Sequence, residues 1–218
     1  MPLPTPSPIA SPRLTIRLVT AADLPGLFVV NGDAAVTQHL PYATWQTLAD
    51  GEAWLVRMHT LGEAGSTLQF VVCDSASGQV LGSCLLFRFD EGSARAELGY
   101  VLGRAHWGHG LMFEALGALL GHAFSAMGLR RIEAEVNVDN QASNDLLRAL
   151  GFLREGHLRQ RWVNTAAAYD TSSDTCSNTS HDTSHDIFHD TSHDAAYNTA
   201  YDTYFYAALA NEWPAPAA

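Results

Sequence analysis

The chain has 218 residues, of which 47% are hydrophobic, and this size and composition predict one domain with a sizeable core. Its net charge of −11 argues against a nucleic-acid partner, because such binding needs a basic surface. No run of 18 apolar residues occurs, and the N-terminus lacks the basic and apolar regions of a signal peptide. Together with three widely spaced cysteines, which fit free thiols, these features lead us to expect a cytoplasmic protein without membrane segments.

The first half of the chain alternates between strand-like and helix-like patterns. Residues 1–12 contain five prolines and are expected to form an extended or disordered lead-in. Apolar periodicity then predicts, in chain order, strand 13–20, helix 23–31, helix 45–61, strand 68–73, strand 80–89 and strand 94–102.

The second half predicts a long helix, a strand, a short helix and two more strands: helix 111–127, a strand within 131–140, a helix within 141–150, strand 153–164 and strand 204–210. The strands on either side of helix 111–127 are expected to be parallel, since a helical crossover usually joins parallel strands. The result is a single α/β domain over residues 13–213, a mixed sheet with helices on both faces, followed by a short tail over 214–218.

A low-complexity insertion rich in His, Asp, Ser and Thr separates the last two predicted strands at residues 171–203. It is expected to be disordered, because it cannot bury enough apolar area to offset the entropy of ordering. Its four histidines recur at intervals of four, and His-rich tracts sometimes bind metals. However, the Thr, Ser and Asp residues disfavour the helix that would align them, so we expect no metal site.

Two glycines, Gly108 and Gly110, lie between the predicted strand 94–102 and helix 111–127. A helix N-terminus offers unpaired N–H groups and a dipole that favours negative charge, and glycines let this backbone approach an anion closely. The segment is not a P-loop, because the chain contains no lysine, nor a dinucleotide fingerprint, because residue 113 is Phe. We interpret it as a pyrophosphate-binding loop.

The order of motifs resembles the GNAT superfamily of acetyl-CoA-dependent N-acetyltransferases, and more narrowly its RimJ/RimL-like branch. That branch carries Glu-Leu/Ile-Gly-Tyr, then Trp-Gly-x-Gly with Glu-Ala in the next turn, then Asn-x-x-Ser before Leu-Gly-Phe. The matching segments here are residues 97–100, 107–110 with 114–115, 140–143 and 150–152. The resemblance covers about residues 13–164 and resumes over about 204–213, and it implies a centrally splayed sheet of the acyl-CoA N-acyltransferase type.

The resemblance also implies that acetyl-CoA is the co-substrate and that no metal is needed. Backbone N–H groups of the glycine loop would bind the pyrophosphate, the end of strand 94–102 would expose its backbone to the pantetheine arm, and Asn140 would bind pantetheine amides. For Asn140 a role as helix N-cap is equally open. Family members usually carry Arg or Gln at the position of Ala105, and Arg104 lies one step away. The implied cofactor-binding residues are Val101, Leu102, Trp107, Gly108, His109, Gly110, Leu111, Met112 and Asn140.

Acetyl transfer of this type is direct: the amine loses a proton, and the departing thiolate gains one. Glu97 and Glu135 both compete for the role of base, and we favour Glu97, although an isolated Glu on a strand is usually a surface residue. The family's usual Tyr acid, seven residues after Asn140, is Leu147 here. In the RimJ/RimL-like branch the implied proton donor is Ser143, which can also simply cap a helix, while Tyr100 is expected to pack in the core.

Three functions remain open at this point. The branch implies acetylation of a primary amine, with a protein N-terminal α-amine as the first choice. Acetylation of a small-molecule amine, such as an amino acid, polyamine or aminoglycoside, is the second enzymatic function. A non-catalytic acyl-CoA-binding module is the alternative from another class, which Glu97, Glu135 and Ser143 argue against. In each case the partner is an amine-bearing peptide or small molecule, and the protein is expected to be a monomer or homodimer.

Overall fold

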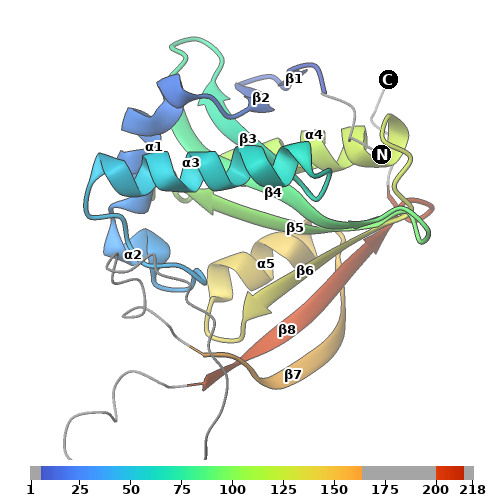
Figure 1. Ribbon diagram of the computed structural model, residues 1–218. Coiled ribbons are helices and arrows are strands. Elements are labelled where there is room, and N and C mark those ends of the chain that lie inside the picture. The colour runs from blue at the N-terminus through green and yellow to red at the C-terminus, as the bar shows by residue number, and fades with distance from the viewer. Residues whose placement is uncertain (1–5, 164–199, 214–218) are drawn as a thin grey trace, which may run out of the picture.

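The computed structural model describes residues 6–163 and 200–213. Within these ranges the chain forms one eight-stranded sheet in the order β1-β2-β3-β4-β5-β6-β8-β7 (Figure 1). The strands are β1 (Ile9–Ala10), β2 (Leu14–Leu18), β3 (Thr67–Asp74), β4 (Val80–Asp90), β5 (Arg95–Leu102), β6 (Arg131–Asn137), β7 (Leu153–Val163) and β8 (Ala200–Leu209). The α-helices are α1 (Leu24–Asn31), α2 (Ala34–Thr37), α3 (Leu48–Glu63), α4 (Leu111–Ser125) and α5 (Gln141–Ala149), with 3₁₀ turns at Ala21–Asp23 and Arg104–His106.

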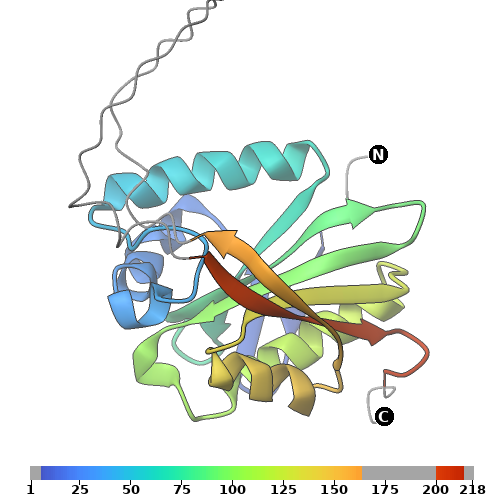
Figure 2. The ribbon, with the colours of Figure 1, turned by 90° about the horizontal axis from the view of Figure 1, so that it is seen from below.

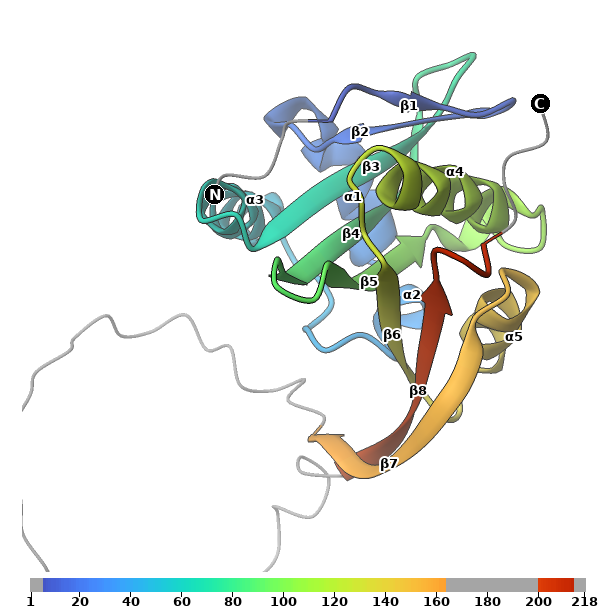
Figure 3. The same cartoon turned by 90° about the vertical axis from the view of Figure 1, so that its right-hand side faces the viewer.

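Helices cover both faces of the sheet, as expected. Helix α3 runs along one side and α4 and α5 lie on the other (Figure 2 and Figure 3). Alternation along β3 explains why two cores form: Phe70 and Val72 pack with α4, whereas Val71 and Cys73 pack with α1 and α3. Both cysteines in the described part of the chain, Cys73 and Cys84, are buried free thiols.

The centre of the sheet is splayed. Strands β5 and β6 are parallel, which confirms the predicted crossover, but they pair only over Arg95–Glu97 and Arg131–Glu133. Beyond this point β5 stays paired with β4 as far as Leu102, and β6 stays paired with β8 as far as Asn137. In Figure 1 the two strands meet at the right and separate toward the left. A fork therefore opens immediately after Glu97, with an unpaired backbone edge on each side.

Several boundaries differ from the sequence-based expectation. Within the Pro-rich lead-in, Ile9–Ala10 forms a short edge strand that pairs with Thr15 and Ile16, since an edge strand tolerates neighbouring prolines that have no N–H to donate. Helix α3 begins at Leu48 rather than residue 45, since Thr47 and Asp50 form a capping box there. The short helix α2 was not anticipated, and Asp33 caps it by accepting a bond from the Ala35 N–H at 2.9 Å.

The last hairpin also starts earlier than predicted. Strand β8 begins at Ala200, so the final four residues of the proposed insertion 171–203 belong to the strand, where Tyr201 lies opposite Trp162. The rest of that insertion, with its four histidines, lies outside the described residues, as does the tail 214–218. In the part of the chain that the structure describes, no helix is both long enough and apolar enough to cross a membrane.

Candidate active site

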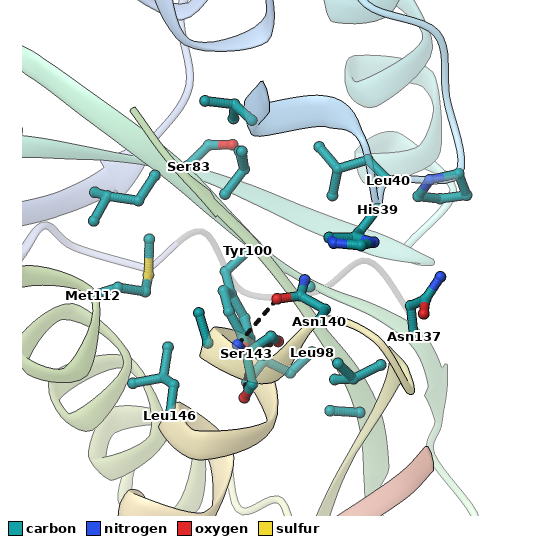
Figure 4. Close-up of a pocket in the computed structure, with 18 of the residues that line it drawn as sticks. His39, Leu40, Ser83, Leu98, Tyr100, Met112, Asn137, Asn140, Ser143 and Leu146 are labelled. Atoms are coloured by element: carbon teal, nitrogen blue, oxygen red, sulfur yellow. Dashed lines mark hydrogen bonds between the residues drawn. The ribbon is translucent and has the colours of Figure 1, made fainter. Parts of the chain in front are cut away.

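A cavity of about 770 Å³ occupies the fork between β5 and β6 and reaches both faces of the sheet. Its walls come from the unpaired edges of both strands, from the starts of α4 and α5, and from α2, α3 and the loop between them. Figure 4 shows Tyr100, Met112, Asn140 and Ser143 around one part of this cavity, with Ser83 and Leu40 lining another. All the sequence-predicted site residues except His109 line it.

The glycine loop has the backbone that its sequence predicts. Gly108 and Gly110 have φ angles of 75° and 70°, in the left-handed region that side chains disfavour, and Gly110 is the N-cap of α4. A Cβ at Gly108 would meet nothing within 4 Å, so the loop surface is bare. The first in-helix bond comes from the Glu114 N–H to the Gly110 carbonyl at 3.1 Å, which leaves the N–H groups of the preceding helical residues available. This surface can accept an anion.

Arg13 supplies the cation at this loop, which the sequence analysis missed. Its Nε donates to Glu114 Oε2 at 2.6 Å, and its Nη1 donates to the His109 carbonyl at 3.1 Å. The backbone N–H of Arg13 and the hydroxyl of Ser11 also donate to Glu114 Oε1. The start of β2 therefore clamps the loop to the first turn of α4. The sequence gives no signal that Arg13 and Glu114 would meet, because they lie far apart in the chain, although Glu114 belongs to the Glu-Ala motif of the RimJ/RimL-like branch.

Arg104 and Trp107 have other partners at the loop. Arg104 forms an ion pair with Asp33 at 2.9 Å, so its charge is directed toward α2. The Trp107 indole donates to the Leu102 carbonyl at 2.7 Å and ties the loop to the end of β5. One acceptor position of Leu102 is thereby occupied, whereas Val101 and Leu102 still line the fork.

Asn140 precedes the first residue of α5, and its Oδ1 accepts a hydrogen bond from the Ser143 N–H at 3.1 Å (Figure 4). The N-cap reading of Asn140 is confirmed by this bond. The Ser143 hydroxyl lies 2.6 Å from the Tyr100 hydroxyl, so Tyr100 packs its ring against the core and also reaches the site. Burial raises the pKa of Tyr100, so its phenol stays protonated and can donate to Ser143. Leu147 is fully buried in the core.

The two candidate bases have different surroundings. Glu97 is the last paired residue of β5 before the fork and is 9% exposed, with Arg88 Nη1 at 2.8 Å from its carboxylate. Burial raises the pKa of Glu97 above its usual value, against the opposing effect of Arg88. For Glu135 burial also acts to raise the pKa, but bonds from Arg161 and the Trp162 indole outweigh it and lower the pKa. Glu97 is therefore the more basic carboxylate.

Strand alternation separates the acidic and hydroxyl groups. Glu97 and Val101 lie on the face that α1, α2 and α3 cover, where Val101 packs with Val30 and Val36, whereas Leu98 and Tyr100 face α4 and α5. The carboxylate consequently lies on one side of the fork and the Tyr100–Ser143 pair lies on the other. A group held in the fork can lose a proton toward one face and receive a proton from the other.

Comparison with known proteins is consistent with this geometry. The sequence family described as an acetyltransferase (GNAT) domain matches residues 13–153. The chain belongs to the GNAT acetyltransferase family. An uncharacterized N-acetyltransferase p20 from Bacillus licheniformis is 33% identical over 147 residues, covering 67% of this chain and 83% of that protein. The predicted family and the predicted N-acetyltransferase activity are thus confirmed.

Two further similarities refine the placement of this acetyltransferase. The [ribosomal protein uS5]-alanine N-acetyltransferase of Escherichia coli (strain K12) is 29% identical over 160 residues, covering 69% of this chain and 80% of that protein. This similarity supports the RimJ/RimL-like branch. A crystal structure of a probable GNAT-family acetyltransferase from Chromobacterium violaceum ATCC 12472 has 25% identity and a TM-score of 0.73, covering 96% of this chain and 89% of that one. Among the described residues, no cluster of His, Cys, Asp and Glu side chains is placed to hold a metal ion.

Proposed function

We propose that this acetyltransferase moves the acetyl group of acetyl-CoA to the N-terminal α-amine of a peptide or protein, in one step within a ternary complex. The observation that carries the proposal is the fork at Glu97, which has a basic carboxylate on one face and the Tyr100–Ser143 hydroxyls on the other. Acetyl-CoA supplies the activated thioester. The residues of this chain bind it, orient it and move two protons.

The loop at Gly108–Gly110 would bind the pyrophosphate through backbone N–H groups, including those of His109, Leu111 and Met112. The left-handed glycines and the absence of obstruction at their Cβ positions support this role. The unpaired edge of β5 at Val101 and Leu102 would pair with the amide groups of the pantetheine arm. Asn140 already caps α5 through one oxygen lone pair, so its remaining lone pair and NH₂ group can serve those amides.

Glu97 would accept the proton of the incoming amine, directly or through one water. Its pKa is raised by burial, which brings it closer to the working pH and makes it a better base. The Arg88 partner keeps the carboxylate oriented toward the fork. Glu135 stays the second candidate, although its arginine partner and its lowered pKa make it the weaker base.

Ser143 would donate its hydroxyl proton to the departing thiolate. Tyr100 would stabilise the Ser143 oxygen, since the phenol is the stronger donor of the two hydroxyls. In this scheme a C–N bond forms and the C–S bond breaks, while one proton leaves nitrogen for Glu97 and one reaches sulfur through Ser143. Solvent restores both groups between turnovers.

A peptide amine is favoured over a polyamine because the acidic groups near the fork are already compensated. Glu97, Glu133 and Glu135 each form an ion pair with an arginine: Arg88, Arg95 and Arg161 respectively. The fork can therefore deprotonate one amine, and the carboxylate that lines the cavity without an arginine partner, Asp139, lies exposed to solvent in the turn before α5, where a second ammonium group would gain little. The similarity to the ribosomal-protein alanine acetyltransferase supports the same choice.

The test is a thiol-release assay with acetyl-CoA and a panel of short peptides, each supplied with a free and with an N-formylated terminus, alongside spermidine and an aminoglycoside. Free peptides should be acetylated, and mass spectrometry should locate the acetyl group on the α-nitrogen. Binding of acetyl-CoA in calorimetry without turnover of any amine would instead indicate a non-catalytic acyl-CoA-binding module.

A further inference from the structure

The part of the cavity on the α3 side has an unusual floor, and we call it the acceptor lobe. Cross-strand pairing places Gln69 opposite Leu85, Leu85 opposite Gly99, and Ser83 opposite Val101, all on the face that carries Glu97. Helix α3 covers this floor with Trp54 and Met58, which line the cavity from above. Because Gly99 has no side chain, the Leu85 side chain lies across it beside Glu97, with its Cδ2 2.5 Å from the position that a Cβ would take.

Two polar side chains of the floor are largely buried, and each has an oxygen atom that faces the cavity without a protein partner. Ser83 and Gln69 are each 6% exposed and both line the cavity. The Ser83 hydroxyl bonds to none of the residues that the structure describes, and it is open to the cavity, because no fully buried side-chain oxygen or nitrogen in these residues lacks a partner. Gln69 Nε2 donates to the carbonyls of Phe70 and Cys84, each at 3.2 Å, which uses both of its N–H groups and leaves Oε1 unpaired.

Oxygen atoms that face a cavity in this way can bond to water, and a bound group that displaces the water must replace those hydrogen bonds to bind well. Gln69 Oε1 is an acceptor only, so the group that satisfies it must be a hydrogen-bond donor. The carboxylates of Glu97 and Glu135, which line the cavity on this side, are already paired with Arg88 and Arg161, and Arg57 adds a further positive charge to the lining. A charged ammonium group would therefore lose its hydration without gaining a counter-ion.

We propose that the acceptor lobe binds an uncharged hydrogen-bond donor of the acceptor, held between the Ser83 hydroxyl and Gln69 Oε1. The Gln69 amide bonds to the carbonyl of Cys84, and Cys84 pairs with Tyr100 on β5. Tyr100 is three residues from Glu97, so the backbone beneath the Gln69 amide lies roughly 10 Å along the strand from Glu97. An amine in contact with the Glu97 carboxylate would lie closer, at about 7 Å from the Gln69 amide, which is the span of two extended residues. The inference rests on the proposed function, because it takes Glu97 as the point where the amine is deprotonated.

Two parts of a peptide can supply such a donor. The backbone N–H of the third residue lies about two extended residues from the α-nitrogen. A polar group on a long first side chain, such as a phenol, reaches a similar distance. Both present the same chemistry to Ser83 and Gln69, and both differ from a polyamine, whose next donor is a cation.

The experiment measures kcat/KM for an alanine tripeptide amide and for propylamine, which has no second donor, in the wild type and in Ser83→Ala and Gln69→Met. Each variant should lower the ratio of tripeptide to propylamine kcat/KM by about tenfold or more, because the donor loses its partner. Ser125→Ala, an exposed serine on α4, is the matched control and should leave the ratio unchanged. Calorimetric affinity for coenzyme A confirms that each variant is folded.

The two sources are separated with modified acceptors. An ester in place of the third-residue N–H should lower wild-type kcat/KM and cause no further loss in Gln69→Met if the backbone is the source. If the first side chain is the source, changing the first residue of the peptide from Phe to Tyr should raise kcat/KM in the wild type but not in Gln69→Met. Equal losses for tripeptide and propylamine, or a higher kcat/KM for spermidine than for the peptides, would overturn the proposal. Failure of the proposed function looks different, since the wild type would then turn over neither propylamine nor peptide.

Discussion

The hydroxyl of Tyr100 provides a sharp test of the proton-transfer scheme. Replacing Tyr100 with Phe keeps the ring that packs against the core and removes only the oxygen that lies 2.6 Å from Ser143 Oγ. If Ser143 passes its proton to the thiolate, negative charge develops on its oxygen, and the bond from Tyr100 becomes charge-assisted. Such bonds contribute roughly 1.5–3 kcal/mol. Since about 1.4 kcal/mol corresponds to a tenfold change in rate, kcat should fall roughly 10- to 100-fold.

Tyr206→Phe is the matched control, because Tyr206 is also buried and also donates to α5. Its hydroxyl donates to Asn144 Oδ1 at 2.9 Å, but it does not line the cavity. Losing this bond should lower the melting temperature and leave kcat near the wild-type value. A purely structural role for Tyr100 would make the two variants behave alike.

The assay is thiol release under saturating acetyl-CoA, with calorimetry to measure coenzyme A affinity and thermal unfolding to measure stability. In Tyr100→Phe the KM for acetyl-CoA should change little, because the phenol acts at sulfur rather than at the phosphates. Combining Tyr100→Phe with Ser143→Ala should lower kcat no further than Ser143→Ala alone, since Tyr100 acts through that hydroxyl. Wild-type kcat in Tyr100→Phe, or an equal loss in Tyr206→Phe, would refute the reasoning.

The remaining predictions concern the base and the loop. Glu97→Gln should lower kcat by about 10²–10⁴-fold with coenzyme A affinity intact, and the deficit should shrink as rising pH deprotonates the amine unaided; a larger loss in Glu135→Gln would reverse the assignment. Gly110→Glu places a side chain and a negative charge at a φ of 70° in the anion site, so calorimetric affinity for coenzyme A should fall by orders of magnitude, and unchanged affinity would contradict the loop assignment. Arg13→Gln removes the clamp on Glu114 and should weaken coenzyme A binding about tenfold while kcat at saturation is kept; a lowered kcat with normal affinity would argue against a role in shaping the loop.

Much of the fold could be predicted because its signals are local. Apolar alternation located seven of the eight described strands, since the two faces of a strand impose a period of two. The glycine loop could be predicted for the same reason. Gly108 and Gly110 adopt positive φ angles just before a helix, and this geometry depends only on residues close by in the sequence. The cap at Asn140 is likewise local, as its oxygen reaches only three residues ahead to Ser143.

What the tertiary structure decided lies in contacts between distant residues. Glu97 and Glu135 look equivalent in the sequence, and they differ because β7 brings Arg161 to Glu135 while burial at the fork dominates for Glu97. Arg13 reaches Glu114 across 101 positions only because β2 and α4 are packed together. The fork itself arises because β5 stays paired with β4 while β6 stays paired with β8, and these pairings join strands that are distant in the sequence. Local pattern sets which backbone conformation each segment adopts, whereas charge partners, burial and cavities depend on which segments the folded sheet brings side by side.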